Sequence, residues 1–230
     1  MIGIIGAMKE EVEEIVAAMT IEKEETKAKM LFRSGKLEGK DVVIVISGIG
    51  KVNAAACTQI LADDFHVDCV VNTGIAGSLK NEINIADVVV SEDVMHHDMD
   101  TTIFGYALGE VPGLGTASFQ ADERLVKIAK ESIEAATPEI GVYVGRVVSG
   151  DQFIASKDVK DKLVENFHGY CAEMEGASIA QTAFLNEIPF VIIRTISDKA
   201  DDSASMDYPV FEKKASEQSV KFIKEFVKRV

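Results

Sequence analysis

MIGIIGAMKEEVEEIVAAM, residues 1–19, sets the pattern of the whole chain. Its first six residues form a short apolar run that is typical of a buried strand, and KEEVEEIVAAM at 9–19 reads as the helix that follows it. The stretch has no basic segment at its start, and glycine interrupts its apolar run. We therefore expect a first strand and helix here rather than a secretory signal.

The same alternation of strand and helix continues along the chain. We expect a hairpin followed by a buried strand within 30–48, and further strands at 68–74, 86–94, 141–151 and 189–197. We expect helices at 51–65, 122–136, 156–166, 175–187 and 207–230, with an irregular segment at 95–120. This order predicts an α/β fold of three layers, α/β/α, around a mixed, mostly parallel central sheet. No linker, composition break or repeat divides residues 1–230, so we expect a single domain.

The overall charge narrows the choice of partners. The 230 residues carry a formal net charge of −14, which repels nucleic-acid backbones and anionic membranes, so we expect neither as a partner. The three cysteines, Cys57, Cys69 and Cys171, lack the spacing of a zinc site and suit a reducing compartment. No apolar stretch approaches the roughly 20 residues of a membrane span. We therefore expect a cytoplasmic protein, and no motif requires a cofactor.

Glycine-rich and polar segments follow the predicted strands, where ligands bind in open α/β sheets. SGIGKVNA (47–54) is neither a phosphate-binding P-loop nor a dinucleotide fingerprint, because Val52 follows Lys51 and Asn53 replaces the third glycine. It is either a tight turn or a backbone surface for a ligand. In NTGIAGSL (72–79), Gly77 permits a close approach that a Cβ would block.

Two further segments invite functional readings. His96 and His97 precede two aspartates, but adjacent residues of an extended segment point apart, so a pocket-shaping loop is favoured over a metal site. FGYALGEVPGLG (104–115) is a long loop that carries Phe104 and Pro112, and such loops are often lids or interfaces.

Three acidic residues lie at or just past the ends of different predicted strands: Glu11, Glu175 and Asp198. Each could be an ordinary surface residue in a chain with 38 acids, and Glu175 could merely complement a helix dipole. Carboxylates in different environments can, however, divide the roles of acid, base and hydrogen-bond acceptor. The pattern favours an α/β enzyme or binding protein for a small neutral or cationic ligand.

Seven segments, in order, resemble those of the 5′-methylthioadenosine/S-adenosylhomocysteine nucleosidase family of the nucleoside phosphorylase superfamily. They are IGIIGAMKEEV, SGIGKVNAA, NTGIAGSL, HHDMDTTIFGY, VSGDQFI, AEMEGASIA and FVIIRTISDKAD. The resemblance as a whole runs in order from residue 2 to about residue 226. The resemblance implies hydrolysis of an adenine–ribose N-glycosidic bond in 5′-methylthioadenosine, S-adenosylhomocysteine and 5′-deoxyadenosine. It also implies a homodimer.

The resemblance assigns roles to particular residues. Asp198 would protonate adenine N7, Glu11 would activate the water, and Glu175 would bind the ribose hydroxyls. The other residues that it implies in substrate binding are Met8, Ile49, Gly77, Phe104, Pro112, Phe153, Ile154, Glu173, Met174, Ser197 and Tyr208. Phe153 would stack on adenine, Phe104 and Pro112 would shape the 5′-alkylthio pocket, partly from the neighbouring subunit, and Arg194 would support the acidic loop. Ile75 departs from the family, which often has a serine there that can hydrogen-bond near the water.

Three alternatives remain at this stage. A phosphorylase of the same fold needs cations for phosphate, whereas GAMKEE after the first strand supplies Lys9 followed by two glutamates. A futalosine hydrolase would differ only in pocket shape. A catalytically silent nucleoside-binding protein would be expected to lack Glu11 or Asp198.

Overall fold

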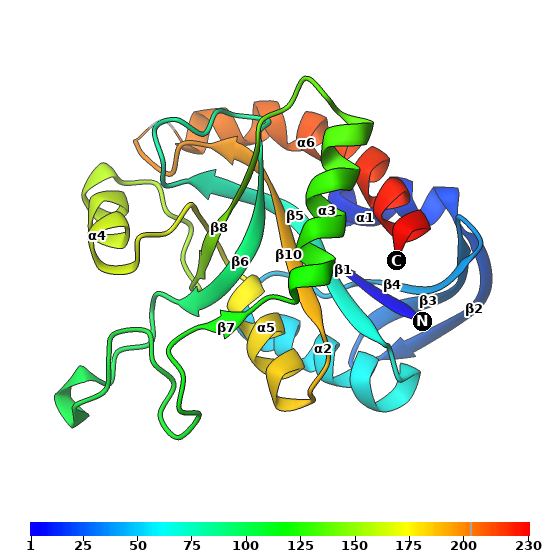
Figure 1. The fold of residues 1–230 in the computed structure, drawn as a ribbon, viewed down its shortest axis with the longest axis horizontal. Coiled ribbons are helices and arrows are strands. Elements are labelled where there is room, and N and C mark those ends of the chain that lie inside the picture. Colours follow the sequence, from blue (N-terminus) through cyan, green and yellow to red (C-terminus); the bar gives the residue numbers. More distant parts are fainter. Residues whose placement is uncertain (203) are drawn as a thin grey trace.

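A computed structural model describes residues 1–202 and 204–230, without the side chains of residues 205–216. The strands are β1 (Ile2–Gly6), β2 (Thr20–Lys27), β3 (Met30–Leu37), β4 (Lys40–Ile46), β5 (Cys69–Ser78), β6 (Val88–His96), β7 (Phe119–Gln120), β8 (Val142–Ser149), β9 (Cys171–Glu173) and β10 (Phe190–Asp198). The helices are α1 (Lys9–Ala18), α2 (Lys51–Phe65), α3 (Glu123–Ala136), α4 (Lys157–Phe167), α5 (Gly176–Leu185) and α6 (Ala204–Arg229), with a 3₁₀ turn, η1 (Thr102–Phe104). Figure 1 shows the strands crossing the middle of the molecule between the helices.

The sheet is mixed, and parallel pairs form its centre. β1 lies between β4 and β5, and β5 continues the parallel arrangement with β10. Beyond β10 the sheet curves through β6 and β8 to β9, which pairs back onto β5. The five strands β5, β10, β6, β8 and β9 therefore close into a ring. Outside the ring, β3 pairs antiparallel with β4 and β2 with β3, and β7 pairs antiparallel with β6.

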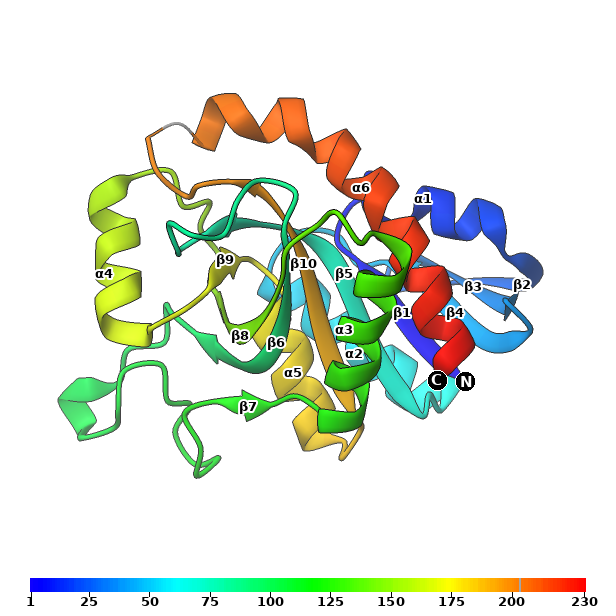
Figure 2. The ribbon, with the colours of Figure 1, turned by 45° about the horizontal axis from the view of Figure 1, so that its top comes forward.

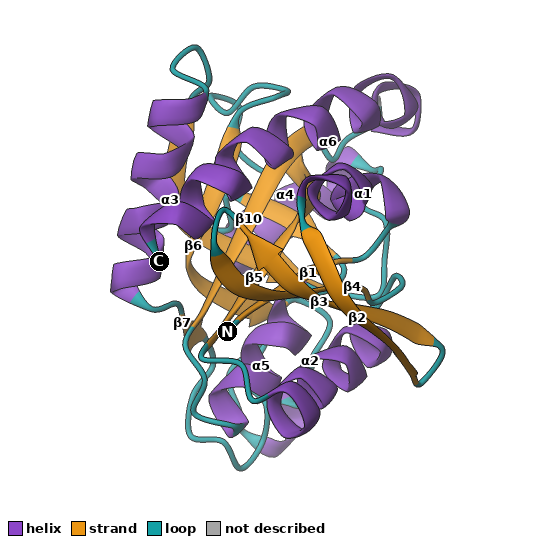
Figure 3. Ribbon diagram, turned by 90° about the vertical axis from the view of Figure 1, so that its right-hand side faces the viewer, coloured by secondary structure: helices purple, strands orange, loops and turns teal. Residues whose placement is uncertain are grey.

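Helices cover both faces of this sheet (Figure 3). On one face α2 and α5 pack together over a core that includes Leu61 and Ile179. On the other face α6 contacts both α1 and α3, over a core that includes Ile15, Ile133 and Phe226. The predicted three-layer α/β fold is confirmed.

Most predicted elements are present within a few residues of their expected bounds, and α2 has the bounds predicted for it. Three strands had no signal in the sequence. β7 has only two residues, at the end of the segment predicted to be irregular, and its pairing with β6 defines it. β2, TIEKEETK, is mostly charged and exposed, and it is a strand because it pairs with β3 at the edge of the sheet. β9 has only three residues, and its two neighbours in the ring define it.

The site lies where the strands around the middle of the sheet end. Polar segments predicted above stand at or just after the ends of four of these strands, β1, β5, β9 and β10. In the part of the chain that the structure describes, no helix has the length and apolar character needed to cross a bilayer.

Candidate active site

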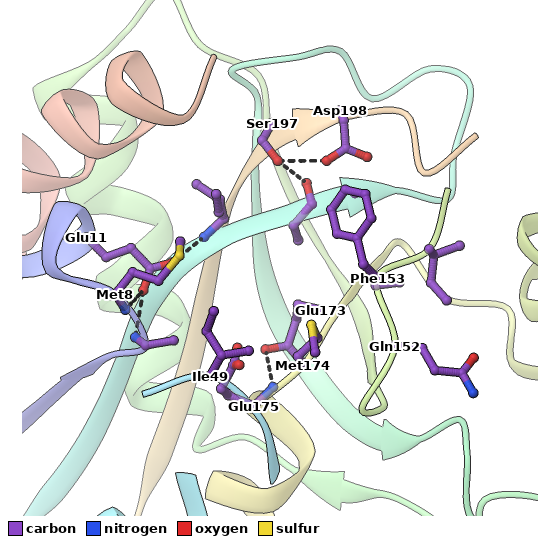
Figure 4. Close-up of a pocket in the computed structure, with 16 residues that line it drawn as sticks. Met8, Glu11, Ile49, Gln152, Phe153, Glu173, Met174, Glu175, Ser197 and Asp198 are labelled. Atoms are coloured by element: carbon purple, nitrogen blue, oxygen red, sulfur yellow. Dashed lines mark hydrogen bonds between the residues drawn. The ribbon is translucent and has the colours of Figure 1, made fainter. Parts of the chain in front are cut away.

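A cavity of about 310 Å³ lies at the carboxyl ends of the central strands (Figure 4). It is lined by Ala7, Met8, Glu11, Ile49, Ile75, Ala76, Gly77, Gln152, Phe153, Ile154, Ala172, Glu173, Met174, Glu175, Ser197 and Asp198. Eleven of the fourteen predicted site residues are in this set. The three acids singled out in the sequence therefore meet around one cavity.

Glu11 lies in the first turn of α1 and is 4% exposed. Its Oε2 accepts hydrogen bonds from the backbone N–H groups of Ala7 (2.6 Å) and Met8 (3.0 Å), and its Oε1 accepts one from Ile75 (3.2 Å). Burial raises the pKa of Glu11, and the charge of Arg194 and the three backbone donors offset only part of this effect. Glu11 thus caps its helix and also presents a buried carboxyl group to the cavity.

Gly74 is required where the Glu11 side chain meets β5. A Cβ at this position would lie 2.6 Å from Oε1 of Glu11 and 2.7 Å from a terminal guanidinium nitrogen of Arg194. No side chain fits at these distances, so glycine lets the carboxylate and the cation approach the strand from the same side.

Arg194 is a buried cation behind the cavity, 1% exposed. It forms an ion pair with Glu173, donates to the side-chain carbonyl of Asn72, and lies 3.8 Å from Oε2 of Glu175. Glu173 also accepts hydrogen bonds from the Ser149 hydroxyl and from backbone N–H groups at the start of α5. Although burial disfavours its charge, the adjacent Arg194 and these donors outweigh burial and lower the pKa of Glu173.

Glu175 is two residues further on but has a different environment. Its Oε1 accepts a hydrogen bond of 2.8 Å from the backbone N–H of Gly50, in the glycine-rich turn before α2. Burial and the neighbouring Glu173 charge raise the pKa of Glu175 to about 7, against the effect of Arg194. The turn SGIGKVNA is therefore part of the pocket wall through its backbone.

Asp198 ends β10 on another side of the cavity and is 2% exposed. The Ser197 hydroxyl donates to its Oδ2 (2.8 Å), and the backbone N–H of Ala200 donates to its Oδ1 (2.8 Å). A Cβ on Gly77 would lie 2.8 Å from Oδ1 of Asp198 and from Cβ of Ala200. The close approach predicted at Gly77 is thus made by the Asp198 loop.

Apolar side chains form the remaining walls. Figure 4 shows the ring of Phe153 facing the cavity below Asp198, with Met8, Ile49 and Met174 toward the other acids. Phe153 is 52% exposed and Ile49 53%, because both lie at the mouth, whereas Ile154 is buried. A planar ligand can stack on the exposed face of the Phe153 ring.

The sequence reasoning did not place Gln152 in the site, and it treated Ile75 only as a departure from a family pattern. Both line the cavity, and the backbone of Ile75 binds Glu11. Neither residue type signals a site in the sequence. Gln152 lines the cavity because of the course of the SGDQFI loop, and Ile75 binds Glu11 through its main chain, which any residue could do.

Three predicted residues are not among those that line the cavity. Phe104, 78% exposed, and Pro112 lie on the loop that extends away from the sheet at the lower left of Figure 1. The side chain of Tyr208 lies outside the described residues. The part that Phe104 and Pro112 play in a partner's pocket stays a prediction.

The two adjacent histidines have structural contacts. The His96 ring lies 2.9 Å from the side-chain oxygen of Gln181, and the His97 ring packs against Gly150. Burial lowers the pKa of both imidazoles. Within residues 1–202 and 204–230, no group of three or more histidine, cysteine or acidic side chains is arranged to hold a metal ion.

The chain is similar to known proteins over its whole length. The phosphorylase superfamily profile matches residues 1–228. A 5′-methylthioadenosine/S-adenosylhomocysteine nucleosidase of Exiguobacterium sp. is 45% identical over 231 residues, which cover 100% of this chain and 98% of that protein. The crystal structure of such a nucleosidase from Neisseria meningitidis, in complex with methylthio-immucillin-A, is 40% identical with a TM-score of 0.96, covering 100% and 99% of the two chains. The chain belongs to the phosphorylase superfamily and, within it, to the 5′-methylthioadenosine/S-adenosylhomocysteine nucleosidases.

One further structure bears on the alternatives. The futalosine hydrolase of Helicobacter pylori is 34% identical with a TM-score of 0.94, covering 100% of this chain and 97% of that one. The backbone fold therefore does not separate these two activities.

Proposed function

We propose that the chain hydrolyses the bond between adenine and ribose in 5′-methylthioadenosine, S-adenosylhomocysteine and 5′-deoxyadenosine. The observation that carries this proposal is the meeting of Glu11, Glu175 and Asp198, from three different strand ends, around one cavity. The relatives named above support the choice of nucleoside. The proposal assigns each acid to a different part of that substrate.

Asp198 acts on the leaving group. It transfers its proton to N7 of adenine, the C1′–N9 bond breaks, and the bonding electron pair leaves with the purine. Proton transfer of this kind contributes about 10²–10⁴-fold to the rate. The Ser197 hydroxyl, 2.8 Å from Oδ2, stabilises the carboxylate that remains.

Glu11 acts on the nucleophile. A water molecule adds its oxygen to C1′, and Glu11 in its ionised form takes the proton that the water releases. Burial raises the pKa of Glu11, which makes the ionised carboxylate a stronger base than an exposed glutamate. Exchange with solvent then returns a proton to Asp198 and removes one from Glu11.

Glu175 accepts hydrogen bonds from the ribose hydroxyls, and Met174 packs against the sugar. Glu173 is held by Arg194 and supports this wall. Phe153 stacks on adenine, and the backbone of Ile154 contacts the edge of the base.

Water is favoured over phosphate as the nucleophile. Among the described residues that line the cavity, none is a lysine or an arginine. Arg194 lies behind them and is already paired with Glu173 and Asn72. Phosphate would meet four buried acidic side chains without an unpaired lysine or arginine among the lining residues to hold it, whereas water meets no such repulsion.

The proposal also covers the oligomeric state of the protein and its location in the cell. Phe104 and Pro112 shape the 5′-alkylthio pocket from the neighbouring subunit of a homodimer, and Tyr208 lines the nucleoside pocket. The protein acts in the cytoplasm, without nucleic acid or membrane as partner.

The test is product analysis with 5′-methylthioadenosine, first in phosphate-free buffer and then with phosphate. Adenine and free methylthioribose, formed at equal rates in both buffers, are the expected result. Turnover that depends on phosphate and yields methylthioribose 1-phosphate would overturn the hydrolytic mechanism. The structural likeness to futalosine hydrolase makes futalosine the comparison substrate, and faster turnover of futalosine would assign that activity instead.

A further inference from the structure

The peptide that follows Asp198 is held from outside the cavity by a buried lysine. Lys160 lies on α4, is 7% exposed, and its Nζ donates a hydrogen bond of 2.6 Å to the backbone carbonyl of Lys199. Lysine is rarely buried to this extent unless its ammonium is paired. In Figure 2, α4 stands beside the loop that joins β10 to α6.

The same peptide unit binds the carboxyl group of Asp198. The Lys199 carbonyl and the Ala200 N–H belong to one planar amide, and in a trans amide the two groups point in opposite directions. The Ala200 N–H donates to Oδ1 of Asp198 at 2.8 Å. One amide therefore connects the Lys160 ammonium to the Asp198 carboxylate through two hydrogen bonds.

This geometry needs support, because Ala200 has a φ of 52°, in the left-handed region that residues with a Cβ rarely occupy. Ala200 is completely buried, in the apolar cluster that also contains Ile154 and Leu163 of α4. The Lys199 side chain anchors the loop on its other side, with Nζ donating to the backbone carbonyl of Ile83. The loop is thus fixed between α4 and the segment after β5.

We propose that Lys160 is a positioning residue for Asp198, acting through the Lys199–Ala200 peptide. Its charge-assisted bond fixes the orientation of the amide and polarises it, which strengthens the Ala200 N–H as a donor. That donor matters most when Asp198 has given up its proton and become negative. An interaction that strengthens in the transition state raises kcat rather than substrate affinity.

The inference rests on the proposed role of Asp198 as the acid, and the test keeps the two apart. Lys160→Met retains the length and packing of the side chain but removes the donor, and Lys160→Arg keeps a charged donor. Lys162→Met is the matched control, because Lys162 is exposed on the same helix. Each variant, and Asp198→Asn beside them, is assayed with 5′-methylthioadenosine at a temperature well below the melting temperature of that variant.

We expect Lys160→Met to lower kcat by about 10- to 100-fold with KM changed less than about threefold, since a small misplacement of a catalytic group has effects of this size. Lys160→Arg should recover part of kcat, and Lys162→Met should match the unmodified chain. A native kcat in Lys160→Met, a rise in KM alone, or an arginine variant no better than methionine would overturn the inference. If Asp198→Asn were fully active, the proposed acid itself would fail; if Asp198→Asn is inactive and Lys160→Met is native, only this inference fails.

Discussion

The two sides of the cavity hold their acids by different means. On one side a single cation, Arg194, favours the charged forms of Glu11, Glu173 and Glu175. At Glu173 this cation and the hydrogen-bond donors outweigh burial and lower the pKa, whereas at Glu11 and Glu175 burial outweighs them and raises it. On the other side Asp198 is bound by neutral donors, a hydroxyl and a backbone amide. Three glutamates around one cation therefore differ in pKa because their burial, neighbouring charges and hydrogen-bond donors differ, although their side chains are identical.

The largest effect is expected from Glu11→Gln, which separates the two roles of this side chain. Glutamine can still accept hydrogen bonds from Ala7 and Met8 and so cap α1, but it cannot take a proton from water. We expect kcat to fall by about 10²–10⁴-fold with a small change in melting temperature. Steady-state adenine release and thermal unfolding measure the two separately. Near-native turnover would mean that Glu11 only caps its helix.

The raised pKa of Glu175 should affect stability. Because this pKa rises from 4.5 to about 7 on folding, the folded chain binds more protons than the unfolded chain between these values. The free energy of unfolding should therefore fall as pH rises through this window, by up to about 3 kcal/mol. Denaturant unfolding at a series of pH values measures it. Glu175→Gln should flatten the curve but not level it, because Glu11 has a shift of the same sense; an unchanged slope would contradict the account.

Gly74→Ala tests how closely the side of the cavity that holds Glu11 and Arg194 is packed. The added Cβ would crowd both Glu11 and Arg194, so we expect a loss of about 1–3 kcal/mol in stability and a lower kcat. Gly145→Ala is the control, since its Cβ would crowd the Tyr170 ring away from the cavity. The control should lose stability but keep kcat per folded molecule. Equal kcat in both variants would show that the packing around Glu11 does not matter for catalysis.

The smallest effect is expected from Ile75→Ser. Ile75 already binds Glu11 through its backbone, so the serine would add only a hydroxyl near the proposed water site. We expect kcat to rise by no more than about tenfold, the size of one hydrogen bond. Ile75→Val, which shortens the side chain without adding a donor, is the comparison. Identical kinetics in the two variants would show that the hydroxyl makes no contact with the water.

Local strand and helix signals predicted the layers of the fold, and the resemblance to a known family supplied most of the residues that line the cavity. It did not predict β2, whose charged residues form a strand only by pairing with β3. Nor did it single out Lys160, since a lysine on an amphipathic helix reads as exposed until tertiary packing buries it. The unequal pKa values of Glu173 and Glu175 depend on Arg194, which is close in space but distant in sequence.

The most direct test of the account is the Asp198→Asn variant with 5′-methylthioadenosine. Asparagine keeps the shape of the side chain but has no acidic proton to give to adenine. Equilibrium binding and single-turnover adenine release should be measured on the same preparation. The account predicts that the nucleoside binds with near-native affinity and stays intact, with release slowed by about 10²–10⁴-fold. Adenine release at the native rate would contradict it.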